Sequence, residues 1–122
     1  MKIRVYYEDT DAAGIVYYAN YLKFCERARS EAFFRRGLTP QSEEGYFVVK
    51  RVEADYIMPA KLGDVLDVET ELLEKRGASI TLLQSLLKDG ETLFKMVVKL
   101  AFLKEGRPAR IPSGLHSIIS EW

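Results

Sequence analysis

The length and charge balance of this chain restrict its possible function. It has 122 residues, of which 48% are hydrophobic and 30% are charged, as is typical of one folded globular domain rather than of a disordered chain. Lysine and arginine together number 18, as do aspartate and glutamate, so the net charge of zero argues against a nucleic-acid-binding protein. No apolar run approaches the roughly 18 residues of a membrane span, and the charged start is unlike a signal peptide. We therefore expect a cytoplasmic protein without a membrane span.

The first third of the chain predicts a strand, a turn and a helix. Residues 2–7 are rich in valine, isoleucine and tyrosine, which favours a short strand, and residues 8–14 form a polar turn. Between residues 18 and 36, apolar side chains recur at spacings of three and four, which predicts a helix of about five turns. Gly37 then serves as the C-cap of this helix, and Pro40 follows three residues later.

After the helix, the hydrophobic period changes to two. Strands are predicted at residues 46–57, 66–72, 79–86 and 93–102, separated by glycine-containing turns. Strands joined by such short turns pair in antiparallel fashion. We therefore predict an α+β fold, in which a five-stranded antiparallel sheet wraps around one long central helix and residues 1–122 form a single domain. The tail favours a short closing helix.

Three acids, Glu8, Asp9 and Asp11, stand immediately before the predicted helix. They could stabilise the turn and the positive end of the helix. They could equally provide chemistry, because Gly14 allows a positive φ or a close approach of the backbone, and the first N–H groups of a helix have no partner of their own. A carboxylate beside unpaired N–H donors is half of an acyl-transfer site. The residues alone leave both interpretations open.

Other chemistries find less support in the residue pattern. The only histidine, His116, lies far from the acids and is interpreted as a tail residue, so neither a metal nor a redox cofactor is expected. Cys25 falls on the apolar face of the predicted helix, where core packing is favoured; as the only cysteine it excludes an internal disulfide. Glu26 could approach the site, although a paired helix carboxylate is favoured.

The segment "VYYEDTDAAGIVYYANYLKFCERAR", residues 5–29, resembles the opening motif of the hotdog-fold acyl-CoA thioesterases. The resemblance is to the 4-hydroxybenzoyl-CoA thioesterase family, and within it to the Tol–Pal-associated YbgC group. It implies the hotdog fold over essentially the whole chain. It also implies a homo-oligomer, a dimer or a tetramer, in which two sheets join edge to edge and each site is built from both chains.

The resemblance assigns roles to particular residues. Asp11 matches the catalytic carboxylate, either general base or nucleophile, and Gly14 matches the glycine of the substrate-binding turn. Tyr18 matches the position whose backbone N–H polarises the thioester carbonyl; many members of the group have histidine there, so any imidazole role is lost in this chain. Lys75 and Arg76 lie where relatives place basic residues against the phosphates of CoA, although a solvated hairpin turn is an equally good interpretation.

The function implied is hydrolysis of an acyl-CoA to a free acid and CoA without a cofactor. A non-catalytic acyl-CoA-binding or protein-interaction module on the same fold is the alternative, since fold does not fix function. A hotdog dehydratase is weaker, because the helix-associated histidine expected there is absent. The tyrosine, phenylalanine and leucine side chains fit aliphatic and aromatic acyl groups equally well, and the resemblance favours short chains.

Overall fold

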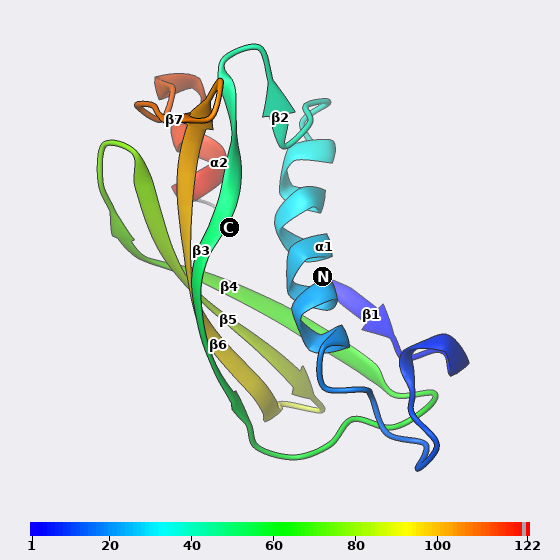
Figure 1. The fold of residues 1–122 in the computed structure, drawn as a ribbon. Helices are drawn as coiled ribbons and strands as arrows, with labels where there is room; N and C mark the ends of the chain where they lie inside the picture. The colour runs from blue at the N-terminus through cyan, green and yellow to red at the C-terminus, as the bar shows by residue number, and fades with distance from the viewer. Residues whose placement is uncertain (121) are drawn as a thin grey trace.

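A computed structural model describes residues 1–120 and 122 of the chain (Figure 1). In this part, one curved antiparallel sheet contains strands in the order β1-β4-β5-β6-β3-β2, and β7 pairs with β6. The strands are β1 (Lys2–Arg4), β2 (Gln41–Ser42), β3 (Gly45–Tyr56), β4 (Val65–Lys75), β5 (Ser79–Lys88), β6 (Glu91–Lys104) and β7 (Arg107–Pro108). The five predicted strands are therefore present. The additions, β2 and β7, are two residues each and too short to show an alternating pattern.

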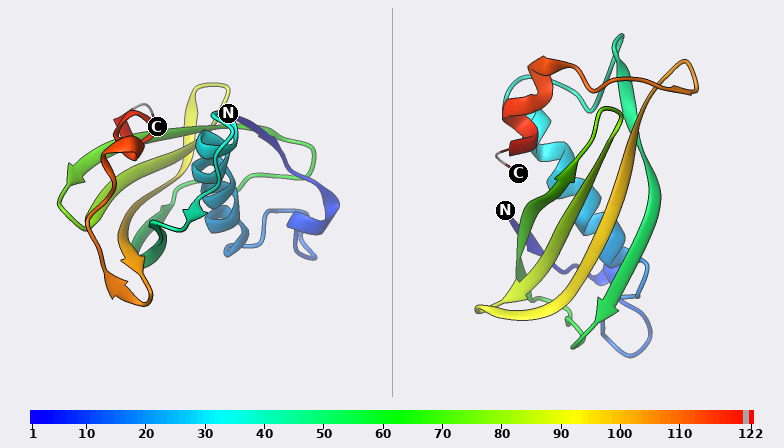
Figure 2. Two further views of the ribbon diagram at one scale, coloured as in Figure 1. Left: turned by 90° about the horizontal axis from the view of Figure 1, so that it is seen from above. Right: turned by 90° about the vertical axis from the view of Figure 1, so that its left-hand side faces the viewer.

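Helix α1 (Asn20–Phe34) lies against the concave face of the sheet, which curls around it (Figures 1 and 2). The helix is shorter than the predicted range of 18–36, because residues 18 and 19 form a turn. At its C-terminus, Gly37 has φ +70° and the N–H of Leu38 donates to the carbonyl of Phe33 over 3.0 Å. This is a Schellman arrangement, so the predicted glycine cap is confirmed.

The core lies between α1 and the concave face of the sheet. The helix contributes Tyr21, Phe24, Cys25 and Ala28. On β6, the alternating residues Phe94, Met96, Val98, Leu100 and Phe102 are all buried, as their period of two predicts. Burial of these large apolar side chains is the main stabilising contribution to the fold.

One buried polar residue ties the helix to two strands. The side chain of Gln84 on β5 is fully buried, and its Nε2 donates to the carbonyl of Cys25 over 3.0 Å and to Oγ1 of Thr70 over 3.1 Å. Its Oε1 accepts a hydrogen bond from Nη1 of Arg29 over 2.7 Å. Because each of these polar atoms has a partner, the network specifies the register of α1 on the sheet.

The predicted closing helix is confirmed at the end of the chain. A 3₁₀ turn, η2 (Ser113–Leu115), leads into α2 (His116–Ser120), where Ile118 and Ile119 are buried. The indole of Trp122 packs edge-on against Phe33 at 6.0 Å between ring centroids. In the described part of the chain, neither α1 nor α2 combines the length and apolarity that crossing a bilayer requires.

Candidate active site

Among the three acids, Asp9 has a structural role. Strand β1 ends earlier than predicted, because η1 (Tyr7–Asp9) forms a 3₁₀ turn. The side chain of Asp9 is buried, and its Oδ2 accepts a hydrogen bond from the N–H of Tyr6 over 2.8 Å. The carbonyl of Asp9 accepts two more, from the N–H of Tyr17 and from Nδ2 of Asn20, each over 2.9 Å. Asp9 therefore braces the loop against the start of α1.

Asp11 has an exposed side chain that is held in place by its own turn. Its Oδ1 accepts a hydrogen bond from the N–H of Ala13 over 2.8 Å, and its carbonyl accepts one from the N–H of Gly14 over 3.0 Å. Oδ2 receives no hydrogen bond from any other described residue. One carboxylate oxygen thus sets the orientation, and the other remains available to a reactant. Glu8 is exposed and has no side-chain hydrogen bond or ion pair within the described residues.

Gly14 adopts φ +79°, a conformation that favours glycine. A Cβ built at this position would meet nothing within 4 Å, so the backbone conformation, not lack of space, requires the glycine. The carbonyl of Gly14 accepts a hydrogen bond from the N–H of Leu62 over 3.2 Å, and the N–H of Val16 donates to the carbonyl of Ala60 over 2.9 Å. These bonds anchor the Asp11 loop to the loop between β3 and β4.

Tyr18 lies in the turn that precedes α1. The N–H of Asn20 donates to the carbonyl of Tyr17 over 2.8 Å and closes this turn. The N–H groups of Tyr18 and Ala19 donate no hydrogen bond to any other described residue. The expected combination is therefore present on one loop: a carboxylate with a free oxygen, and backbone donors without partners beside a helix N-terminus.

Sequence reasoning missed a tyrosine beside this turn. Tyr56, at the end of β3, donates from its hydroxyl to the carbonyl of Tyr18 over 2.9 Å. Its ring lies 6.3 Å from that of Tyr18, which in turn lies 4.9 Å from the ring of Tyr17. Partial burial, and next the nearby phenol of Tyr18, raise the pKa of Tyr56, so its hydroxyl remains protonated at neutral pH. No motif marks this residue, because the contact depends on the folded sheet.

Lys75 and Arg76 lie at the hairpin between β4 and β5. Together with Arg110 and His116 they line a pocket of about 310 Å³, and Arg76 also pairs with the carboxylate of Glu74. Sequence reasoning missed Arg110 and interpreted His116 as a tail residue; only the folded chain brings these two residues beside Lys75 and Arg76. Within one chain, this hairpin and the Asp11 loop lie at opposite ends of the sheet (Figures 1 and 2).

Two further candidates from the sequence have structural explanations. Cys25 is fully buried, and burial raises the pKa of its thiol to about 12, so it is not a nucleophile. Glu26 accepts a hydrogen bond from Oγ of Ser30 over 2.8 Å, the paired helix carboxylate that was favoured. No group of three or more histidine, cysteine or acidic side chains that could hold a metal occurs among residues 1–120 and 122.

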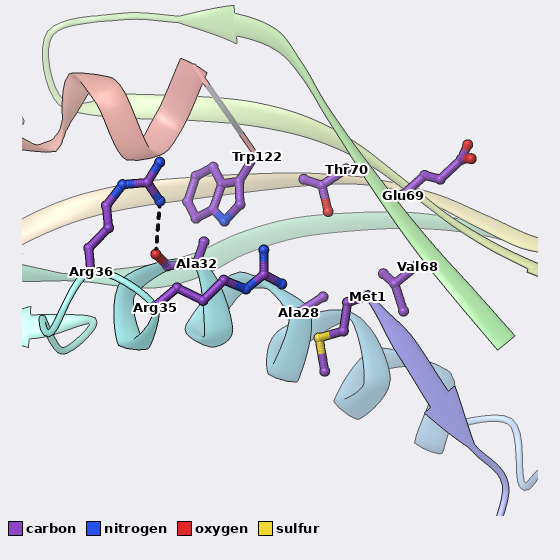
Figure 3. A pocket seen from close by; sticks show the side chains of 9 residues that line it. All are labelled: Met1, Ala28, Ala32, Arg35, Arg36, Val68, Glu69, Thr70 and Trp122. Atoms are coloured by element: carbon purple, nitrogen blue, oxygen red, sulfur yellow. Dashed lines mark hydrogen bonds between the residues drawn. The ribbon is translucent and has the colours of Figure 1, made fainter. Parts of the chain in front are cut away.

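A pocket of about 620 Å³ opens between α1 and β4 (Figure 3). Figure 3 shows Arg35 and Arg36 reaching from the end of α1 beside the indole of Trp122, and Nη1 of Arg36 donates to the carbonyl of Ala32 over 3.1 Å. None of its lining residues belongs to the Asp11 loop or to the turn before α1. The pocket is therefore separate from the candidate site.

The family model of the thioesterase superfamily matches residues 13–95. The chain belongs to the thioesterase superfamily. It is 52% identical over 86 residues to the acyl-CoA thioesterase YbgC of Helicobacter pylori; the match covers 70% of this chain and 65% of that protein. It is 41% identical to the acyl-CoA thioesterase YbgC of Haemophilus influenzae, covering 95% of this chain and 93% of that one. The resemblance drawn from residues 5–29 is confirmed.

The fold agrees with this membership of the thioesterase superfamily. A thioesterase of Thermus thermophilus, solved in complex with coenzyme A and zinc, superposes with a TM-score of 0.84 at 33% identity. The match covers 98% of this chain and 89% of that one. The curved antiparallel sheet around α1 is the hotdog fold.

Proposed function

We propose that this protein is an acyl-CoA thioester hydrolase. The observation that carries the proposal is that one braced loop holds both the Asp11 carboxylate and the N–H of Tyr18, which has no hydrogen-bond partner among the described residues. The thioesterase names of its relatives support the same reaction class. The overall change adds water to a thioester, giving a carboxylic acid and the free thiol of CoA.

The proposed mechanism uses the two ends of the loop for different tasks. The thioester carbonyl oxygen accepts a hydrogen bond from the Tyr18 N–H, which stabilises the negative charge that develops there. Oδ2 of Asp11 either removes a proton from the attacking water or attacks the carbonyl carbon itself. The C–S bond then breaks, and the sulfur takes up a proton and leaves as a thiol; the proton comes from Asp11 in the general-base route and from solvent water in the nucleophilic route. In the nucleophilic route, water hydrolyses the resulting anhydride and restores the carboxylate.

The basic cluster of Lys75, Arg76, Arg110 and His116 is the proposed site for the phosphates of CoA. Guanidinium groups suit phosphate because their planar donors can bind two oxygens at once. The separation of this cluster from Asp11 within one chain favours a site composed of two chains, with the reacting end on one and the basic cluster on the other.

A homo-oligomer, at least a dimer, is therefore part of the proposal. Strand β3 pairs with β6 along one edge, whereas its other edge pairs within the described residues only with β2, at Gly45 and Tyr46. Val49 and Val52 on this strand are exposed. An open strand edge with apolar side chains favours pairing with a second chain. Sedimentation at assay concentration tests this, and a fully active monomer would contradict it.

Release of free thiol from a panel of acyl-CoAs tests the hydrolase directly. The panel comprises acetyl-, butyryl-, octanoyl- and benzoyl-CoA, with the variant Asp11→Asn as the control for contaminating activity. We expect turnover by the wild type of at least one ester and its loss in the variant. Binding of the esters without thiol release would instead favour the non-catalytic acyl-CoA-binding module.

A further inference from the structure

Tyr56 joins the sheet to the turn that carries the oxyanion donor. Its hydroxyl donates to the carbonyl of Tyr18 over 2.9 Å, across a separation of 38 residues in the chain. The mechanism above assigns no task to this phenol. Resting on that proposed function, we propose that Tyr56 is a positioning residue, which holds the turn at Tyr18 in the conformation that presents the N–H of Ala19, beside that of Tyr18, to the thioester carbonyl.

The sheet and the core, not the loop, determine where the Tyr56 ring lies. Tyr56 pairs with Phe94 across β3 and β6, and its ring packs against that of Phe94 at 5.1 Å and against Tyr21 at 5.5 Å, both edge-on. Tyr21 is itself buried and stacks on Phe94 at 4.9 Å. Because these contacts already restrict the side-chain rotation of Tyr56, its hydroxyl loses little further conformational entropy when it donates to Tyr18. The ring is therefore a rigid support for the Tyr18 turn.

The bond from Tyr56 acts on the middle peptide of the turn. The N–H of Asn20 and the carbonyl of Tyr17 close the turn over 2.8 Å, and the peptide between Tyr18 and Ala19 lies at its centre. A peptide group is planar, so a hydrogen bond to its carbonyl also sets the direction of its N–H. Without the phenol, the central peptide could rotate at small cost in energy. That rotation would change ψ of Tyr18 and φ of Ala19 and misdirect the N–H of Ala19.

Both peptides that flank Tyr18 are thus held by their oxygens, while their N–H groups have no partner among the residues that the structure describes. The carbonyl of Tyr17 is held by Asn20, and the carbonyl of Tyr18 is held by Tyr56. This leaves the adjacent N–H groups of Tyr18 and Ala19 free to donate to a substrate oxygen. A donor fixed before the reaction needs no reorganisation as negative charge develops, so Tyr56 should affect kcat more than KM.

The test is Tyr56→Phe, which removes only the hydroxyl and keeps the ring contacts. We expect kcat to fall about fivefold, the effect of losing one neutral hydrogen bond of roughly 1 kcal/mol, with KM within about twofold of wild type. Tyr7→Phe is the matched control, because Tyr7 is 83% exposed and its hydroxyl makes no hydrogen bond with the described residues. Thermal unfolding of both variants should remain close to that of the wild type.

A spectroscopic measurement separates positioning from general loosening. In the Asp11→Asn background, bound benzoyl-CoA with a ¹³C-labelled carbonyl should show an infrared carbonyl band shifted to lower frequency by the N–H groups of Tyr18 and Ala19. Adding Tyr56→Phe should reduce that shift. An unchanged kcat and band would overturn the role of Tyr56, as would a loss of kcat accompanied by an equal rise in KM and a lower Tm. Full activity of Asp11→Asn would instead contradict the proposed function, whatever the result for Tyr56→Phe.

Discussion

The side-chain amide of Asn20 donates to the main-chain carbonyl of Asp9 over 2.9 Å, so the first residue of α1 fixes the loop that leads to Asp11. Asn20→Ala removes this bond and leaves the Asp9 carbonyl with the N–H of Tyr17 as its partner. We expect a loss of about 1 kcal/mol in the free energy of unfolding, measured by chemical denaturation, and a several-fold lower kcat. Lys23→Ala, an exposed change on the same helix, is the control; equal effects of the two would show that Asn20 has no special role.

Asp11→Asn should remove catalysis and keep the fold. The amide oxygen of asparagine can still accept the N–H of Ala13, so the turn is preserved while the free carboxylate oxygen is lost. We predict that kcat falls at least about 10²-fold, the low end for a positioned acid or base. Circular dichroism should match that of the wild type. Native-like turnover would remove Asp11 from the mechanism.

The role of Asp11 as general base or nucleophile can be separated by isotope labelling. Wild-type protein undergoes a single turnover in ¹⁸O-labelled water, and the peptide containing Asp11 is then examined by mass spectrometry. Label in the carboxylate indicates a covalent anhydride intermediate. Label in the released acid alone indicates a general base.

Tyr18 should act through its backbone rather than through its phenol. Tyr18→Phe keeps the N–H and is expected to change kcat by less than about threefold, whereas Tyr18→Pro removes the donor and should lower kcat by about 10²-fold or more. Because the N–H of Tyr18 donates to no other described residue, replacing Tyr18 by proline removes no hydrogen bond among the described residues. If Tyr18→Phe lowered kcat as much as Tyr18→Pro, and both variants were folded, the phenol of Tyr18 would take part in catalysis.

Lys75 and Arg76 should affect CoA binding and not the chemical step. Both are exposed, so each contact is expected to contribute on the order of 1 kcal/mol or less and to be screened by salt. Lys75→Ala/Arg76→Ala should raise KM for an acyl-CoA several-fold, leave kcat nearly unchanged and weaken the salt dependence of KM. An acyl-pantetheine, which lacks the nucleotide, should be cleaved equally well by both proteins, and Lys95→Ala serves as the exposed control. An unaltered KM at low salt would show that the hairpin does not contribute to CoA binding.

The loop between β3 and β4, which anchors Gly14, should make the free energy of unfolding depend on pH. Nζ of Lys88 pairs with Oδ1 of Asp64 over 2.9 Å. Burial by itself would raise the pKa of Asp64, but hydrogen bonds from Lys88 and from the N–H of Lys61, with the charges of both lysines, lower it overall. A lowered carboxyl pKa in the folded state means that the stabilisation is complete above the ordinary value of 3.8 and disappears as the pH falls through the lower, folded value.

Thermal unfolding between pH 2 and 7 measures this contribution. Lys88→Met should lower Tm at neutral pH, and the difference from the wild type should shrink as Asp64 becomes protonated. Lys2→Met is the matched control, since Lys2 and Asp67 form a more exposed pair. A difference in Tm that stays constant down to pH 2 would show that Lys88 contributes through packing and not through its charge.

Local patterns in the sequence determined much of the fold. The period of two in residues 93–102 identified the buried face of β6, because successive side chains of a strand point to opposite faces. Gly37 marked the end of α1, because few other residues adopt its positive φ easily. The motif of residues 5–29 likewise indicated the thioesterase superfamily and singled out Asp11 and Tyr18.

Only the tertiary structure assigned different roles to residues that look alike in the sequence. Asp9 and Asp11 are two positions apart, yet Asp9 is buried as a brace and Asp11 is exposed with a free oxygen, because burial depends on what packs over each side chain. The bond between Tyr56 and Tyr18, and the meeting of Arg110 with Lys75, join positions far apart in the chain. Such contacts depend on the register and curvature of the whole sheet, which no short segment encodes.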